Sequence, residues 1–170
     1  MANTYVLLNS NTVGVGGTAS VTFSSIPQTY TDLMVRISAR STLSGAKVIV
    51  QINGVTSSSY QGKNLIGTGS ATSSSANSTS GYQTGLTPST YTASAFTSAD
   101  IYIPNYTLAS SQKALQVMSA TENNAALSEQ QFNSGANSNL QLAITSINFA
   151  PDATLFAQYT TFYLYGISNT

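Results

Sequence analysis

The stretch Ile26–Arg40, IPQTYTDLMVRISAR, decides the fold class. After the turn at Pro27, apolar and polar residues alternate strictly. The apolar positions are Leu33, Val35, Ile37 and Ala39, the polar ones are Asp32, Arg36, Ser38 and Arg40, and only Met34 breaks the pattern. A helix would place Leu33 and Ile37 beside Arg36 and Arg40, so the period of two predicts a half-buried strand from about Tyr30 to Arg40.

Three charged residues share the polar face of this predicted strand. Asp32, Arg36 and Arg40 follow one another at about 13 Å, since a strand rises roughly 3.3 Å per residue. That separation is too large for them to pair with one another, so their partners come from neighbouring strands or from another chain. Two interpretations stay open: the three charges face solvent and solubilise the protein, or they fix the register of an interface.

The remaining chain repeats this β pattern. Short apolar or alternating runs are separated by turn signals, and no segment is convincingly helical. The pattern predicts an all-β fold of eight to ten strands in a two-sheet sandwich of the jelly-roll or Greek-key type, formed by residues 1–170 as a single domain. Thr4–Leu8 is expected to be a strand, either within the core or pairing with a neighbouring molecule.

Three further segments carry specific predictions. Asn53-Gly54 follows the alternating run Lys47–Ile52, and both residues tolerate the positive φ of a type I′ turn, so a hairpin with Val55–Tyr60 is expected. Lys113–Thr121 fits both a helical face and a strand; we expect a strand with Leu115 and Val117 inward. Leu140–Phe149 is predicted to be a strand throughout.

The segment from about residue 67 to 92 differs in composition from the rest. It consists mostly of Ser, Thr, Gly and Ala, and it buries too little apolar area to offset its ordering entropy, so a long surface loop is expected. Tyr82 and Tyr91 are its aromatic exceptions. They either pin the loop to the sheet or form an exposed contact patch.

The composition excludes several classes of function. Charged residues make up 6% of the chain and the net charge is zero, so no basic patch for nucleic acid can form, and such a surface favours association. The residues after Met1 lack a basic start and a long apolar run, so we expect no secretory signal. The chain has no His, no Cys and no apolar run long enough to span a membrane. We therefore expect no catalytic residues, no metal site and no cofactor. A glycoside hydrolase would need a carboxylate pair, for which Glu122 and Glu129 are the only close candidates.

Several segments resemble small virion proteins of tailed bacteriophages, cyanophages included. The block Phe23–Leu33 (FSSIPQTYTDL), followed by the strand to Arg40, carries the resemblance together with the closing Tyr159–Ile167 (YTTFYLYGI). Between them, Tyr102–Tyr106 (YIPNY) and Glu122-Asn123-Asn124 lie in the expected order. The resemblance covers most of the chain outside the segment 67–92.

This resemblance implies a jelly-roll cement or decoration protein. Such a protein is made in the host cytoplasm, is often a homotrimer, and binds the major capsid protein on the outer surface of the head. From the composition, the expected partners exclude nucleic acid and membrane. The candidate subunit or capsid contacts are Tyr5, Val6, Leu7, Asp32, Arg36 and Arg40. The alternative is a tail-fibre or spike domain that binds host glycan through exposed loop contacts at Tyr82 and Tyr91.

Overall fold

In the residues that a computed structural model describes, twelve β-strands make up the regular structure. The structure describes residues 4–44, 47–57, 60–123, 128–137 and 141–168. The strands are β1 (Tyr5–Thr12), β2 (Val21–Phe23), β3 (Asp32–Ala39), β4 (Lys47–Ile52), β5 (Tyr60–Gly67), β6 (Thr72–Thr79), β7 (Tyr82–Gly85), β8 (Thr97–Ile103), β9 (Lys113–Glu122), β10 (Ser128–Asn137), β11 (Ile147–Pro151) and β12 (Thr161–Ile167). The all-β prediction is confirmed, with more strands than the expected eight to ten.

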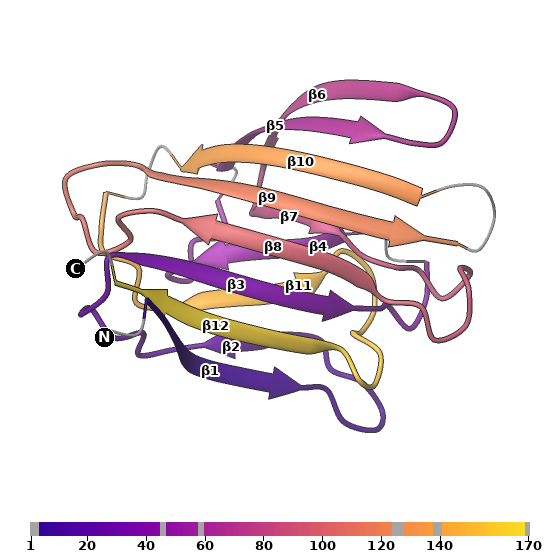
Figure 1. Cartoon of the computed structure of the whole chain (residues 1–170), viewed down its shortest axis with the longest axis horizontal. Coiled ribbons are helices and arrows are strands. Elements are labelled where there is room, and N and C mark those ends of the chain that lie inside the picture. The colour runs from indigo at the N-terminus through magenta and orange to yellow at the C-terminus, as the bar shows by residue number, and fades with distance from the viewer. Residues whose placement is uncertain (1–3, 45–46, 58–59, 124–127, 138–140, 169–170) are drawn as a thin grey trace.

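The strands form two antiparallel sheets (Figure 1). The large sheet has eight strands in the order β1-β12-β3-β8-β9-β10-β5-β6, and the small sheet has four in the order β2-β11-β4-β7. The hairpin β5–β6 and strand β1 lie at opposite edges of the large sheet. No helix in the described ranges is long and apolar enough to cross a membrane.

Strand β3 behaves as its alternation predicts. Leu33, Val35, Ile37 and Ala39 are buried, while Arg36 is exposed. The strand lies between β12 and β8 in the large sheet. The stretch that decides the fold class therefore holds an interior position, with one side of the strand in the core.

The core lies between the inner faces of the two sheets. Val48, Val50 and Ile52 of β4 are fully buried, as their alternation predicts, and belong to the same apolar cluster as Val35 of β3. Phe149 of β11 and Phe162 of β12 join the sheets, with ring centroids 5.0 Å apart. Burial of these side chains supplies the main stabilisation, at roughly 2 kcal/mol each.

The turn at Asn53-Gly54 forms, but the predicted hairpin partner is wrong. Asn53 and Gly54 have φ of 52° and 69°, and the Val55 N–H donates to the Ile52 carbonyl at 3.0 Å. Beyond the turn the chain crosses to the large sheet, where β5 pairs with β10 and β6. Strand β4 instead pairs with β11 and β7. Two residues set the turn geometry, whereas the distant β11 determines which strand β4 pairs with.

The predicted loop from 67 to 92 is a second correction, because it contains β6 and β7. Strand β6 pairs with β5 residue by residue, from Thr79 opposite Tyr60 to Thr72 opposite Gly67. Its side chains at 72–76 are exposed, so we attribute its order to backbone pairing with β5, which β10 holds from the other side. Strand β7 contributes to the core through Tyr82 and Thr84.

Of the two remaining segments, one prediction is confirmed and one is partly wrong. Strand β9 alternates buried and exposed residues along its whole length, with Leu115 and Val117 inward as predicted. The strand expected over Leu140–Phe149 begins only at Ile147, and Leu140 lies outside the described residues. The Asn53 side chain accepts hydrogen bonds from the Thr145 and Ser146 N–H groups, which keeps them from the sheet.

Candidate interaction face and sheet edges

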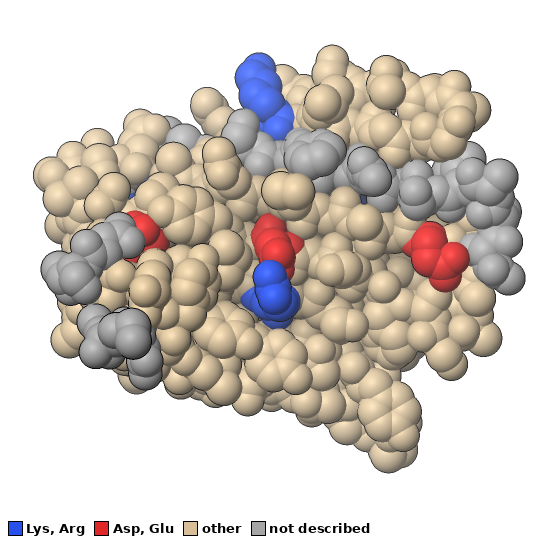
Figure 2. Space-filling view, in the orientation of Figure 1, with Lys and Arg blue, Asp and Glu red and all other residues tan. Residues whose placement is uncertain are grey.

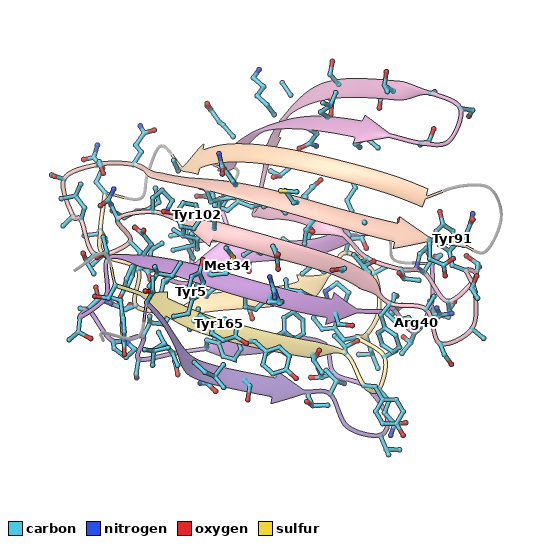
Figure 3. All side chains as sticks on the ribbon, viewed as in Figure 1. Tyr5, Met34, Arg40, Tyr91, Tyr102 and Tyr165 are labelled. Atoms are coloured by element: carbon cyan, nitrogen blue, oxygen red, sulfur yellow. The ribbon has the colours of Figure 1, made fainter. Side chains whose placement is uncertain are left out.

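The exposed side of the large sheet is the most prominent surface of the protein. We call it the outer face, meaning the side turned away from the small sheet. One row of register partners crosses it from Leu7 through Tyr165, Met34 and Tyr102 to Gln116. The row places aromatic and sulfur-containing side chains from β12, β3 and β8 beside one another (Figure 3).

A second row spans all eight strands. It runs Ser10, Tyr163, Arg36, Asp100, Met118, Phe132, Leu65 and Ser74. Met118 is 58% exposed and Leu65 is 53% exposed. Figure 2 shows that this side of the molecule is mostly uncharged, with isolated charged side chains and one contacting pair of opposite charge near its centre. The outer face thus offers large apolar and aromatic groups to solvent.

The central charges of the outer face neutralise each other. Arg36 Nε donates to Asp100 Oδ1 at 2.9 Å, and Arg36 Nη2 donates to Oδ2 at 3.1 Å. The hydrogen bond to Asp100, followed by its negative charge, raises the pKa of Arg36. The pair confirms that the partner of Arg36 comes from a neighbouring strand. An exposed pair of this kind contributes at most about 1 kcal/mol to stability, so its main effect is to cancel charge on the face.

Asp32 is not a solubilising charge, because it is buried. Its Oδ2 accepts the Tyr102 hydroxyl and its Oδ1 accepts the Asn105 N–H, both at 2.8 Å. The hydrogen bond to Asp32 raises the pKa of Tyr102. The carboxylate therefore holds the end of β8 and the following turn, and it fixes Tyr102 on the outer face.

Arg40 organises a segment far along the chain. Its Nη1 donates to the Thr92 and Ala95 carbonyls at 2.7 and 2.9 Å, and its Nη2 donates to the Ser89 and Tyr91 carbonyls at 3.0 and 3.2 Å. A guanidinium presents its donors in a fixed planar fork, which suits several carbonyls at once. Tyr91, one of the two aromatics predicted for exposed contacts, is half-buried in this segment.

Tyr82, the other candidate for an exposed contact, is buried, so that prediction is wrong. Its ring lies 4.8 Å from the Tyr60 ring and its hydroxyl donates to the Lys113 carbonyl at 3.0 Å. Burial raises the pKa of Tyr82 above its ordinary value. The other interpretation holds for Tyr82: its aromatic ring packs the segment against the sheet.

The three N-terminal candidates lie on β1, which forms one edge of the large sheet. Tyr5 and Leu7 are 55% and 51% exposed, whereas Val6 is half-buried. The Tyr5 ring meets the Tyr165 ring edge to face at 6.5 Å, so this edge is continuous with the outer face. Tyr5, Leu7 and Arg36 are thus brought together on one side of the sheet, while Asp32 and Arg40 serve contacts within the chain.

Several large side chains of the outer face were missed from the sequence. They include Met34, Leu65, Tyr102, Met118, Tyr163 and Tyr165. The alternation of Phe162 and Leu164 with Tyr163 and Tyr165 assigns these tyrosines to the side opposite the core. This alternation could have been read from the sequence. The strand order β12-β3-β8-β9 could not, because strand neighbours far apart in the chain have no local signature.

The part of the chain that the structure describes contains no cluster of three or more His, Cys, Asp or Glu residues that could hold a metal ion. Glu122 pairs with Ser128 and Glu129 with Thr121, which places the two acidic residues near each other in the β9–β10 ladder. The side chain of Glu129 lies outside what the structure describes.

Comparison with known proteins adds no relative. No protein-family model matches the chain, and neither a curated protein nor a solved structure is significantly similar to it.

Proposed function

We propose that the protein is a non-enzymatic virion protein that binds the outer surface of a bacteriophage head and stabilises the assembled capsid lattice. The outer face of the large sheet is the contact surface in this proposal. Copies of the chain associate as a homotrimer, and the major capsid protein is the partner.

The pairing order of eight strands supports this proposal, because it is the order expected of a jelly roll. The eight strands are β1, β2, β3, β4, β7, β8, β11 and β12. They pair from the two ends of this series inward: β1 with β12, β2 with β11, β3 with β8, and β4 with β7. Rolling up an antiparallel ribbon of four such pairs produces the jelly roll that is common in capsid proteins. The hairpins β5–β6 and β9–β10 then extend one of its sheets.

The outer face carries the proposal, because its size and chemistry suit a contact surface. Eight strands spaced about 4.8 Å apart span roughly 34 Å, and seven residues of strand span about 23 Å, which gives roughly 800 Å². One partner of a standard interface contributes about that area. Tyrosine and methionine are enriched at interfaces, and the paired charges Arg36 and Asp100 leave little to repel a partner.

The segments that carry the family resemblance also meet in space. Strand β12, which contains most of the closing segment, pairs with β3 along its whole length. The Tyr106 hydroxyl donates to the Pro27 carbonyl, which joins the segment Tyr102–Tyr106 to the first block. Three of the four segments of the resemblance therefore contact one another in the fold.

The mechanism would be thermodynamic. A protein that binds the assembled lattice and not its separate subunits stabilises the lattice by mass action. Contact area alone is sufficient, so the scarcity of catalytic side chains is compatible with this role.

Substitution on the outer face tests which surface binds. Met118→Lys places a charge in the middle of the outer face and should weaken binding to tail-less heads of the phage by about tenfold or more. Val15→Lys is the matched control, since Val15 is 88% exposed in the turn after β1. Equal binding of the two variants in a co-sedimentation assay would refute the outer face as the contact surface. Adhesion to host cells without binding to heads would instead favour the tail-fibre alternative.

A further inference from the structure

The large sheet ends in two strands that have a neighbour on one side only. Among the described residues, β1 pairs with β12 alone and β6 pairs with β5 alone. An edge strand presents a row of unpaired N–H and C=O groups, and monomeric proteins usually block it with lysine, proline or a covering loop. Strands β1 and β6 contain no charged residue and no proline. A bulge between Leu7 and Asn9 is the only irregularity of the β1 ladder.

The two edges match each other in length and direction. Each strand has eight residues. Every pairing in the sheet is antiparallel, so the first and the eighth strands run in opposite directions. A second copy related by rotation about an axis parallel to the strands therefore brings its β6 antiparallel to β1 of the first copy, and the ladder continues across the joint.

We propose that β1 of one copy pairs with β6 of the next, head to tail, so that the large sheets of several copies join edge to edge in a closed ring. This inference rests on the self-association contained in the proposed function, and it identifies the interface. A ring leaves no edge strand of the large sheet unpaired. A two-fold pairing of β1 with β1 would leave β6 open in both copies.

The chemistry of both edges favours another copy of this chain as the occupant. A neutral chain with two uncharged edges lacks the repulsion that keeps copies apart. The exposed Tyr5 and Leu7 of β1 would be partly covered by the neighbouring hairpin. Ser10 and Ser74 lie at the two ends of the row that crosses all eight strands. If the same register continues from one copy to the next, as we propose, the two residues lie side by side on the outer face.

Cross-linking tests this joint in free protein, without capsids. The chain contains no cysteine, so single thiols report specific contacts. Ser10→Cys and Ser74→Cys are prepared separately, mixed, and treated with a short bismaleimide. The mixture should give about tenfold more cross-linked dimer than either variant alone, because only the mixture contains the facing pair at high effective concentration. A double variant should form closed rings whose mass matches that found by light scattering.

The controls separate this joint from other contacts. Val15→Cys mixed with Ser74→Cys measures random collisions, and thermal unfolding of each variant confirms the fold. Cross-linking of Ser10→Cys with itself would show a two-fold joint and overturn the proposal. An uncross-linked mixture would overturn it as well, whether the protein is monomeric or associates through another surface. Binding to heads is measured separately, so the joint between β1 and β6 can fail while head binding through the outer face stands, and head binding can fail while the joint stands.

Discussion

A single side chain can hold a loop that lies far away in the sequence, and Arg40 is the clearest case in this protein. Its four hydrogen bonds to the carbonyls between Ser89 and Ala95 are made by one charged group. Arg40→Met should lower the free energy of unfolding by about 2 kcal/mol, since a hydrogen bond to a charged group contributes more than a neutral one. Arg36→Met is the matched control and should cost less than about 1 kcal/mol. Equal losses in urea denaturation would contradict this account.

Tyr82 gives the stability a dependence on alkaline pH. Burial raises its pKa in the folded state, so the unfolded chain releases the proton first and stability falls as pH rises above the ordinary tyrosine value of about 10. Tyr82→Phe should cost about 1 kcal/mol near neutral pH, through the lost bond to Lys113. The variant should lose less stability than the parent between about pH 8 and about pH 11, as urea denaturation would measure. If the difference in stability between the variant and the parent were the same at both pH values, the assignment of this pH dependence to Tyr82 would be contradicted.

The local periodicity of residues predicted their side of a strand well, and it predicted their partners poorly. The alternation in Ile26–Arg40 and in Lys113–Thr121 correctly separates buried from exposed positions, since the period of two is a local property. Asp32 shows where prediction from periodicity fails. Its position in the alternation faces away from the core, yet its carboxylate accepts hydrogen bonds from Tyr102 and Asn105, some 70 residues later. Such contacts have no signal in the neighbouring sequence.

At the scale of elements, the polar strand β6 shows why composition misled the prediction. A strand was excluded because the segment buries little apolar area, but β6 takes its order from β5, which β10 holds in place. Tyr82 connects these added strands to the small sheet through Tyr60 of β5, Lys113 of β9 and Gly135 of β10. The order of the strands, and with it the composition of the outer face, comes from these long-range contacts.

Gly135 is the position where this connection is tightest. A Cβ atom there would lie 2.6 Å from the Tyr82 ring and 2.8 Å from the Gln61 carbonyl oxygen. Gly135→Ala should therefore lower the free energy of unfolding by about 2 kcal/mol through overpacking. Hydrogen exchange should show the loss as faster exchange in β5 and β6. Gly67→Ala is the control, because a Cβ atom there meets nothing within 4 Å. Equal effects of both substitutions would contradict the tight contact.

At the scale of the whole molecule, three features agree with the contact role that we propose. The outer face is broad, aromatic and nearly neutral, and its central charges are paired within the chain. Among the described residues, the first and the last strand of the same sheet each have one neighbouring strand. In the proposed function the protein acts through the area it covers, so its effect is measured on the assembly to which it binds.

Thermal disruption of purified tail-less heads, with and without the added protein, tests this account most directly. The protein should co-sediment with the expanded heads and raise the temperature at which they release DNA, because a ligand of the assembled state stabilises that state. The increase should saturate with protein concentration and should be weaker for Met118→Lys than for Val15→Lys. Heads that neither bind the protein nor change their disruption temperature, at any concentration where it remains soluble, would contradict the account.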